Sequence, residues 1–287
     1  MGEAARTRQQ SARERIAAQQ AAGRRADIRR RALAAGASIL TVLAIVMAFV
    51  IFRAGQGTAA GSPVGTALPA SVSRQVLHVP ASTLDAVGGG SVTAGAVKAI
   101  TGAPLTSSGK PEMLYIGAEF CPYCAELRWS MAIALSRFGT FTTPLHGIHS
   151  SPTDVYPSTA TLTFYKARYT SPYLTFTPVE NEKVDHSPLQ PATPRQQAIW
   201  NKYDPNSYPF IDFGNKYAIT TPIYDPQVLH GKTWAQIAAA LHDPASPIAR
   251  GTDGAANYIT AAICRITGSK PASACAAPAI RTLEGKL

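Results

Sequence analysis

The chain has 287 residues, of which 46% are hydrophobic and only 15% charged, a composition that excludes an intrinsically disordered protein. Its net charge of +10 at pH 7 would suit nucleic-acid binding, but the charge is unevenly distributed. Residues 1–32 alone contain nine Arg and three acidic residues, and the chain after Arg53 carries only +3. A basic groove is therefore not predicted, and we expect no nucleic-acid partner.

A run of 20 uncharged residues from Leu33 to Phe52 follows the basic segment. A helix of this length spans about 30 Å, which matches the hydrocarbon core of a bilayer. Arg29, Arg30 and Arg31 precede the run directly, and such residues stay on the cytoplasmic side. The sequence therefore predicts a single-pass protein of the cell membrane with a cytoplasmic N-terminus and an extracytoplasmic C-terminal domain.

The expected organisation has four parts. They are a cytoplasmic basic segment (1–32), a transmembrane helix (33–53) that acts as a signal anchor in the lipid bilayer, a linker and lead-in (54–110), and a folded domain (111–287) with an insert at about 140–205. A cleaved signal peptide, with a small-residue site at Thr58-Ala59-Ala60, is the alternative to the anchor.

The folded domain shows alternating strand and helix patterns. Within the lead-in we expect one short helix near 93–100. The elements expected after it are a strand at 113–120, a helix from Cys124 to Phe138 ended by Gly139, two strands within 158–179, a helix at 195–203, strands at 208–213 and 216–220, and helices at 233–241 and 255–267. This order predicts an α/β fold with a mixed central sheet flanked by helices.

The segment Cys-Pro-Tyr-Cys, residues 121–124, carries the most specific chemical signal. It lies where a strand is followed by a helix, so Cys121 meets the free backbone N–H groups of the helix N-terminus, which stabilise a thiolate. Cys121 is predicted to be the exposed catalytic nucleophile, and Cys124, one turn later, the resolving thiol. Pro122 suits the first helical turn, and with Tyr123 it is expected to shape the substrate-binding edge.

Three alternatives to a redox site remain open at this point. Cys121 and Cys124 could bind zinc together with His146 and His149, although the spacing differs from that of a zinc finger. They could form a purely structural disulfide, or belong to a redox fold that has lost its activity. We expect neither a metal nor a cofactor.

A second feature lies later in the chain, in the segment Ser207 to Gly214. Pro209 precedes an apolar strand and is predicted to form a cis-proline loop facing the cysteine pair. Tyr208 would then offer backbone groups to an extended substrate segment. A simple strand-leading proline is the alternative.

The segment GAEFCPYC, the helix after it and the later YPFIDFG resemble the thioredoxin superfamily, and the Cys-Pro-Tyr-Cys quartet is similar to that of glutaredoxins. Longer stretches between about 105 and 277 resemble a membrane-anchored thioredoxin-like domain family of unknown function found in bacteria and archaea. The resemblance implies a thioredoxin-like arrangement of the central sheet.

The chain also departs from the thioredoxin pattern. Thioredoxins keep a buried acid six residues before the first cysteine, where this chain has Tyr115. Glu119 and Glu126 are the nearest acids, and either could relay protons. The favoured interpretation is that each is a loop or helix-surface charge. The glutathione-binding pattern of glutaredoxins is not evident before Pro209.

Cys264 and Cys275 form the second pair of cysteines. Because an extracytoplasmic location favours oxidation, we predict a structural disulfide between them, with a second redox pair as the alternative.

The function that the sequence favours is a membrane-tethered extracytoplasmic thiol–disulfide oxidoreductase. Its expected partners are exported proteins with thiols or disulfides and a membrane redox partner. The alternative is a non-catalytic binding module for an extended partner peptide.

Overall fold

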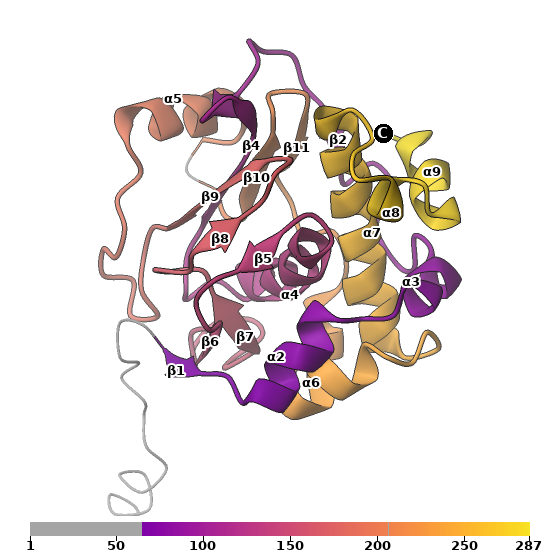
Figure 1. Cartoon of the computed structure of the whole chain (residues 1–287). Helices are drawn as coiled ribbons and strands as arrows, with labels where there is room; N and C mark the ends of the chain where they lie inside the picture. The colour runs from indigo at the N-terminus through magenta and orange to yellow at the C-terminus, as the bar shows by residue number, and fades with distance from the viewer. Residues whose placement is uncertain (1–64, 206) are drawn as a thin grey trace, which may run out of the picture. The chain divides into compact units, whose positions relative to one another are not determined.

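A six-stranded sheet forms the centre of the part of the chain that the structure, a computed structural model, describes: residues 65–205 and 207–287 (Figure 1). The predicted basic segment, the predicted span at 33–53 and the Thr58-Ala59-Ala60 site lie outside these residues. None of the helices in the described ranges combines the length and apolar character that a membrane crossing needs.

The central sheet is mixed, as the sequence predicts. Its strands lie in the order β2 (Lys98–Ala99), β11 (Tyr217–Ile219), β10 (Phe210–Phe213), β4 (Lys110–Gly117) and β3 (Thr106–Ser107), and β9 (Thr175–Glu180) also pairs with β4. The β4–β9 pair is parallel and the other pairs are antiparallel. The α/β class and the mixed sheet flanked by helices are therefore confirmed.

Strand β4 is buried on both faces, which explains its unbroken apolar sequence. Met113 and Tyr115 belong to the larger hydrophobic core, whereas Leu114 and Ile116 belong to a smaller core on the opposite face. Successive side chains of a strand point to opposite faces of the sheet, so this split follows directly from the pleat.

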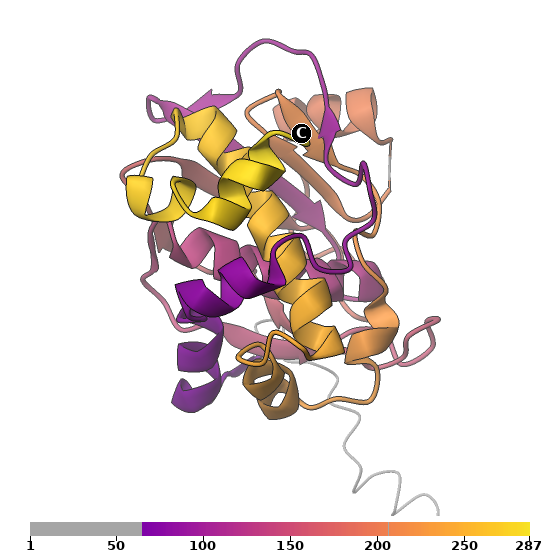
Figure 2. The same ribbon diagram turned by 90° about the vertical axis from the view of Figure 1, so that its right-hand side faces the viewer.

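Helices cover both faces of the sheet. The smaller core includes Trp200 of α5 (Pro194–Tyr203), and the larger core includes the apolar side chains of α4 (Pro122–Ser136) and α7 (Pro247–Thr267). Figure 1 shows α5 on one side of the sheet and α4 with α7 on the other, and Figure 2 shows α7 running diagonally in front of the sheet. Because α4 is enclosed by the sheet and by α7, nearly all of its side chains are buried.

The remaining elements surround this arrangement. They are the small sheet of β1 (Thr66–Ala67), β6 (His146–His149) and β7 (Ala160–Thr163), the pair β5 (Thr140–Phe141) and β8 (Tyr169–Thr170), the helices α2 (Ala70–Leu77), α3 (Ala81–Val87), α6 (Trp234–Ala240), α8 (Ala272–Cys275) and α9 (Pro278–Glu284), and the 3₁₀ helix η1 (Pro226–Leu229).

The lead-in is more ordered than the sequence suggested. Instead of a helix near 93–100 the structure has turns followed by β2, so this prediction is wrong. Two short helices, α2 and α3, lie within the predicted linker and lead-in (54–110), and each follows a proline, Pro69 or Pro80. They form because Val72 and Val76 of α2 and Leu84 of α3 reach the core, which a short isolated helix needs for stability.

The segment expected as an insert supplies part of the central sheet. Three strands, rather than two, begin within 158–179, and the last of them, β9, is the parallel neighbour of β4. Its alternating Thr residues resemble a half-exposed strand, and only the pairing with β4 places it at the centre.

Helix α7 begins at Pro247, eight residues before the predicted start at 255. The prediction missed its first part because that part contains two glycines, which are uncommon inside helices. A Cβ at Gly251 would lie 2.5 Å from the Tyr224 ring, and one at Gly254 would lie 2.7 Å from the Gly89 carbonyl oxygen. These glycines permit close packing and do not end the helix.

The predicted disulfide between Cys264 and Cys275 is present and joins the end of α7 to α8. Both sulfurs are buried against the larger core, as expected of a structural link.

Candidate functional site

The cysteine pair lies at the junction of β4 and α4, as the sequence predicts. Strand β4 ends at Gly117, and Cys121 is the N-cap of α4 with Pro122 in its first turn. The Cys121 sulfur accepts a hydrogen bond from the Cys124 backbone N–H at 3.2 Å. Both cysteines are free thiols, so the interpretation as a permanent structural disulfide is not what the structure contains.

The two thiols have different electrostatic environments. Hydrogen bonds from the Cys124 thiol and the Cys124 backbone N–H lower the pKa of Cys121 despite its burial. Burial raises the pKa of Cys124, and its hydrogen bond to Cys121 raises it further. The arrangement therefore favours a thiolate at Cys121 and a protonated thiol at Cys124.

Cys121 is less accessible than the sequence suggested. It was predicted to be an exposed nucleophile, yet only 4% of it is exposed, because it packs against Ala118 with Phe120, Tyr123 and Tyr208 around it. A substrate sulfur can reach Cys121 only where these aromatic side chains leave room.

The loop before β10 lies beside the cysteines. The Tyr208–Pro209 peptide bond is cis, as predicted. Phe210 pairs with Ile116, and continuing this register places Pro209 opposite Gly117 and Tyr208 opposite Ala118. Pro209 is buried and Tyr208 is half-buried, so Tyr208 presents the accessible surface of this loop.

Four predicted substrate-binding residues therefore divide into two kinds. Pro122 and Pro209 are buried and shape the backbone, whereas Tyr123 and Tyr208 are half-buried and face the cluster of sulfurs. Tyr123 packs edge-to-face on Tyr156, with 6.1 Å between the ring centroids.

Glu119 and Glu126 are both buried, so the favoured interpretation of these residues as surface charges is wrong. Glu119, 3% exposed, accepts a hydrogen bond from Thr163 Oγ1 at 2.8 Å, and burial raises its pKa to about 7. Glu126, with no exposed surface, accepts from the Ile223 N–H at 3.0 Å. For Glu126 the sequence could not reveal this because α4 is covered on all sides instead of one, and for Glu119 because its partner Thr163 is 44 residues away in the chain.

Glu126 has the closer electrostatic link to the thiols. Burial raises its pKa well above its ordinary value, and the negative charge of a Cys121 thiolate raises it further. Its Oε2 atom has no hydrogen-bond partner within the described ranges. An uncommitted carboxyl oxygen near the pair can take or return a proton.

The sequence analysis did not predict a buried ion pair that lies next to the cysteines. Arg128 of α4 contacts Glu180 at the end of β9, with 2.7 Å between Nη2 and Oε2, and neither side chain is exposed. Arg128 Nη2 also donates to the Ala118 carbonyl at 2.7 Å. A signal was present in the sequence, since Arg128 is four residues after Cys124 in a helix that is otherwise mostly apolar.

The structure does not bring the four proposed zinc ligands together. His146 and His149 lie on β6 in the small sheet, and His149 packs on Trp234 with 4.4 Å between ring centroids. In residues 65–205 and 207–287 no group of three or more His, Cys, Asp or Glu side chains could hold a metal ion.

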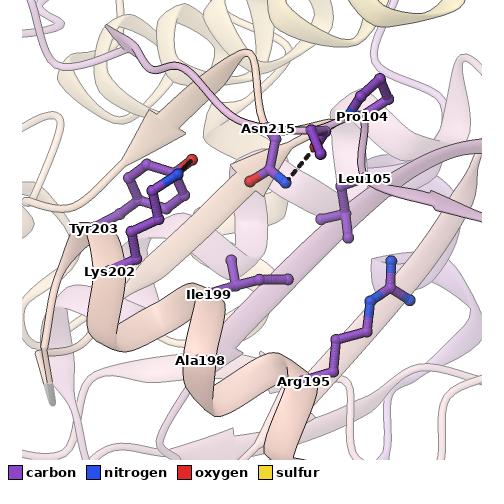
Figure 3. A pocket seen from close by; sticks show the side chains of 9 residues that line it. Pro104, Leu105, Arg195, Ala198, Ile199, Lys202, Tyr203 and Asn215 are labelled. Carbon is purple, nitrogen blue, oxygen red and sulfur yellow. Dashed lines mark hydrogen bonds between the residues drawn. The ribbon is translucent and has the colours of Figure 1, made fainter.

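A cavity of about 350 Å³ lies between α5 and the segment around Pro104 and Leu105 (Figure 3). Its lining contains no cysteine. Both of its cations already have partners: Lys202 Nζ donates to the Thr101 carbonyl, and Arg195 lies 3.8 Å from Glu112. The cavity therefore does not compete with the cysteine pair as the candidate site.

Comparison with known proteins yields one match. Residues 97–265 match a family model described as a domain of unknown function, DUF929. No curated protein and no solved structure matches the chain. The matched range contains both Cys121 and Cys124 and the whole central sheet.

Proposed function

The chain belongs to the family described as domain of unknown function DUF929, and we propose that it is a thioredoxin-like thiol–disulfide oxidoreductase. We also retain the proposal that the run from Leu33 to Phe52 tethers it to a membrane, with exported proteins as substrates. The observation that carries the redox proposal is the hydrogen bond from the Cys124 N–H to the Cys121 sulfur at the N-terminus of α4. This bond stabilises negative charge on one of two adjacent sulfurs.

The chemistry proposed is a two-step exchange. The Cys121 thiolate attacks a substrate disulfide, forms a mixed disulfide and releases one substrate thiolate. Cys124 then loses its proton and attacks the Cys121 sulfur, which forms the Cys121–Cys124 disulfide and releases the second substrate thiolate. Two electrons pass from the pair to the substrate, and the reverse sequence oxidises a substrate dithiol. A dithiol or disulfide partner must restore the pair.

The accessible aromatic side chains support a polypeptide substrate. Phe120, Tyr123 and Tyr208 surround the sulfurs, and Tyr208 precedes a strand whose register runs towards Ala118. An extended segment can pair with backbone groups at such a loop while its cysteine meets Cys121.

Trapping of mixed disulfides tests the proposal. We expect Cys124→Ser to accumulate a covalent complex with a disulfide-bonded protein such as insulin, because the resolving thiol is missing. Cys121→Ser should form none, because the remaining thiol is buried and protonated. The complex is measured on non-reducing gels and by mass spectrometry, with Cys264 and Cys275 intact.

Equal inertness of the two variants would refute the exchange mechanism. If the wild-type thiols were also unreactive while the protein still captured an extended peptide, the binding-module alternative would replace it. The low exposure of Cys121 favours this alternative, because a buried sulfur is harder for a substrate to reach.

A proton relay through Glu126 gives a second prediction. We expect Glu126→Gln to slow the resolution step, the attack of Cys124 on the mixed disulfide, by about 10- to 100-fold, because the neutral Glu126 carboxyl no longer gives a proton to the substrate thiolate that leaves Cys121. Stopped-flow measurement of mixed-disulfide decay reports this step. Glu119→Gln is the matched control, since its carboxylate is engaged by Thr163. A larger effect from Glu119→Gln would transfer the role to that residue.

A further inference from the structure

The ion pair of Arg128 and Glu180 is costly to bury. Besides the Nη2 contact, Arg128 Nε donates to Glu180 Oε1 at 2.9 Å, and the Phe164 N–H donates to the same oxygen at 3.1 Å. Removing two charges from water costs several kcal/mol per ion, and apolar replacements of such pairs are often as stable. Stability alone therefore does not account for this pair.

The arginine end of the pair faces the sulfurs. Arg128 and Cys124 are four residues apart on α4 and so share one side of the helix. Arg128 also donates a hydrogen bond to the Ala118 carbonyl oxygen, and Ala118 packs against Cys121 and Cys124. Its third nitrogen, Nη1, has no hydrogen-bond partner in the described part of the chain. The guanidinium is thus close to the pair, and one of its nitrogens makes no hydrogen bond to any described residue.

The other titratable groups near the pair tend to be neutral. Burial raises the pKa of Tyr115 on β4, Glu126 on α4 and Tyr208 before β10, and it raises that of Glu119 to about 7. The protonated forms of these groups carry no charge.

Two further charged residues, Glu182 and Lys183, lie half-buried in the segment after β9. Glu182 accepts a hydrogen bond from the Tyr208 hydroxyl at 2.9 Å. Arg128 differs from Lys183 in having no exposed surface, so water screens its charge least.

We propose that Arg128 is a positioning residue of the cysteine couple: its buried positive charge, oriented by Glu180, stabilises the anionic sulfur of the reduced pair and makes the couple more oxidising. The inference rests on the proposed function. Reduction of the Cys121–Cys124 disulfide takes two electrons and one proton and yields a thiolate at Cys121 and a thiol at Cys124. With glutathione as reductant, two thiols supply the electrons and become one disulfide. A cation beside the thiolate favours this product.

The electrostatic environment of the two thiols agrees with the geometry. After the hydrogen bonds from Cys124, the charge of Arg128 contributes to lowering the pKa of Cys121. At Cys124 it opposes the larger effect of burial, which raises the pKa of that thiol.

Three variants of the purified full-length chain test the proposal. The double variant Arg128→Met with Glu180→Gln removes both charges together. Glu180→Gln alone leaves the cation uncompensated, and Arg128→Lys retains a positive charge. The readouts are the pH dependence of Cys121 alkylation by iodoacetamide, followed on its peptide by mass spectrometry, and the equilibrium of the couple with glutathione. Circular dichroism establishes that each variant is folded.

We expect the double variant to raise the pKa of Cys121 by about one unit and to lower the equilibrium constant for reduction about tenfold, which corresponds to about 30 mV. Glu180→Gln should shift both quantities in the opposite direction, and Arg128→Lys should remain near the wild type. A merely structural role would not produce shifts of opposite sign. Unchanged values, or shifts of the same sign in the double variant and Glu180→Gln, would overturn the inference.

The two proposals fail separately. If the shifts occur as expected but Cys124→Ser traps no substrate, the oxidoreductase function is wrong and the influence of Arg128 on the sulfur stands. If trapping succeeds but the variants leave the pKa of Cys121 and the equilibrium unchanged, the role of Arg128 is wrong and the exchange mechanism stands.

Discussion

We expect the free energy of unfolding to fall by several kcal/mol as the pH rises from 4 to 8, with Asp253 as a main contributor. Asp253 lies on α7 with no exposed surface, and neither carboxyl oxygen has a partner in the described residues. Burial raises its pKa to about 8. In the unfolded chain the group ionises near pH 4.

The direction in which stability changes with pH follows from the pKa values of Asp253 in the folded and unfolded states. Below pH 4 both states are protonated and the raised pKa stabilises the fold fully. Between pH 4 and 8 the unfolded chain loses the proton while the folded protein keeps it, so stability falls continuously. A difference of about four pKa units corresponds to about 5 kcal/mol at most. Glu119, with a pKa of about 7, contributes in the same direction.

Asp253→Asn isolates this contribution. The amide imitates the neutral acid, so we expect the variant to match the wild type at pH 4 and to exceed its stability at pH 8. Urea unfolding at a series of pH values measures both. Asp243→Asn, at an exposed position, is the control. A wild-type stability that rises between pH 4 and 8 would contradict the expectation.

We expect Arg128→Met to destabilise the fold by about 3–5 kcal/mol, because it leaves the Glu180 carboxylate buried without its cation. The double variant Arg128→Met with Glu180→Gln should recover most of this loss, since no uncompensated charge then remains. The pair would thus show strong coupling in a double-mutant cycle although its net contribution to stability is small.

Arg195→Met provides the matched control for the ion pair. Arg195 lies 3.8 Å from Glu112, but its side chain is 61% exposed, so its removal should change the free energy of unfolding by less than about 1 kcal/mol. Urea unfolding at pH 7 measures these three variants and Glu180→Gln, the other single change of the cycle. If the single and double changes at Arg128 cost the same, burial of an unpaired carboxylate is not the cause.

Local patterns in the sequence predict most of the reactive junction. A short apolar strand, Cys121 at a helix start and Pro122 in the first turn are features of adjacent residues, and the structure has them as expected. The cis bond before Pro209 and the Cys264–Cys275 disulfide were also inferred correctly. The glycines of α7 misled the prediction, because their role depends on what packs against them.

The sequence by itself determined the alternation of elements, the mixed α/β class and the two cysteines that share a helix N-terminus, because these depend on residues close together in the chain. Only the tertiary structure decided that α4 is buried on nearly every side. Since the sheet and α7 enclose that helix, Glu126 and Arg128 lie inside, and β9 brings Glu180 from 52 residues away to Arg128. Burial and long-range pairing of charges depend on packing between elements, which no local pattern encodes.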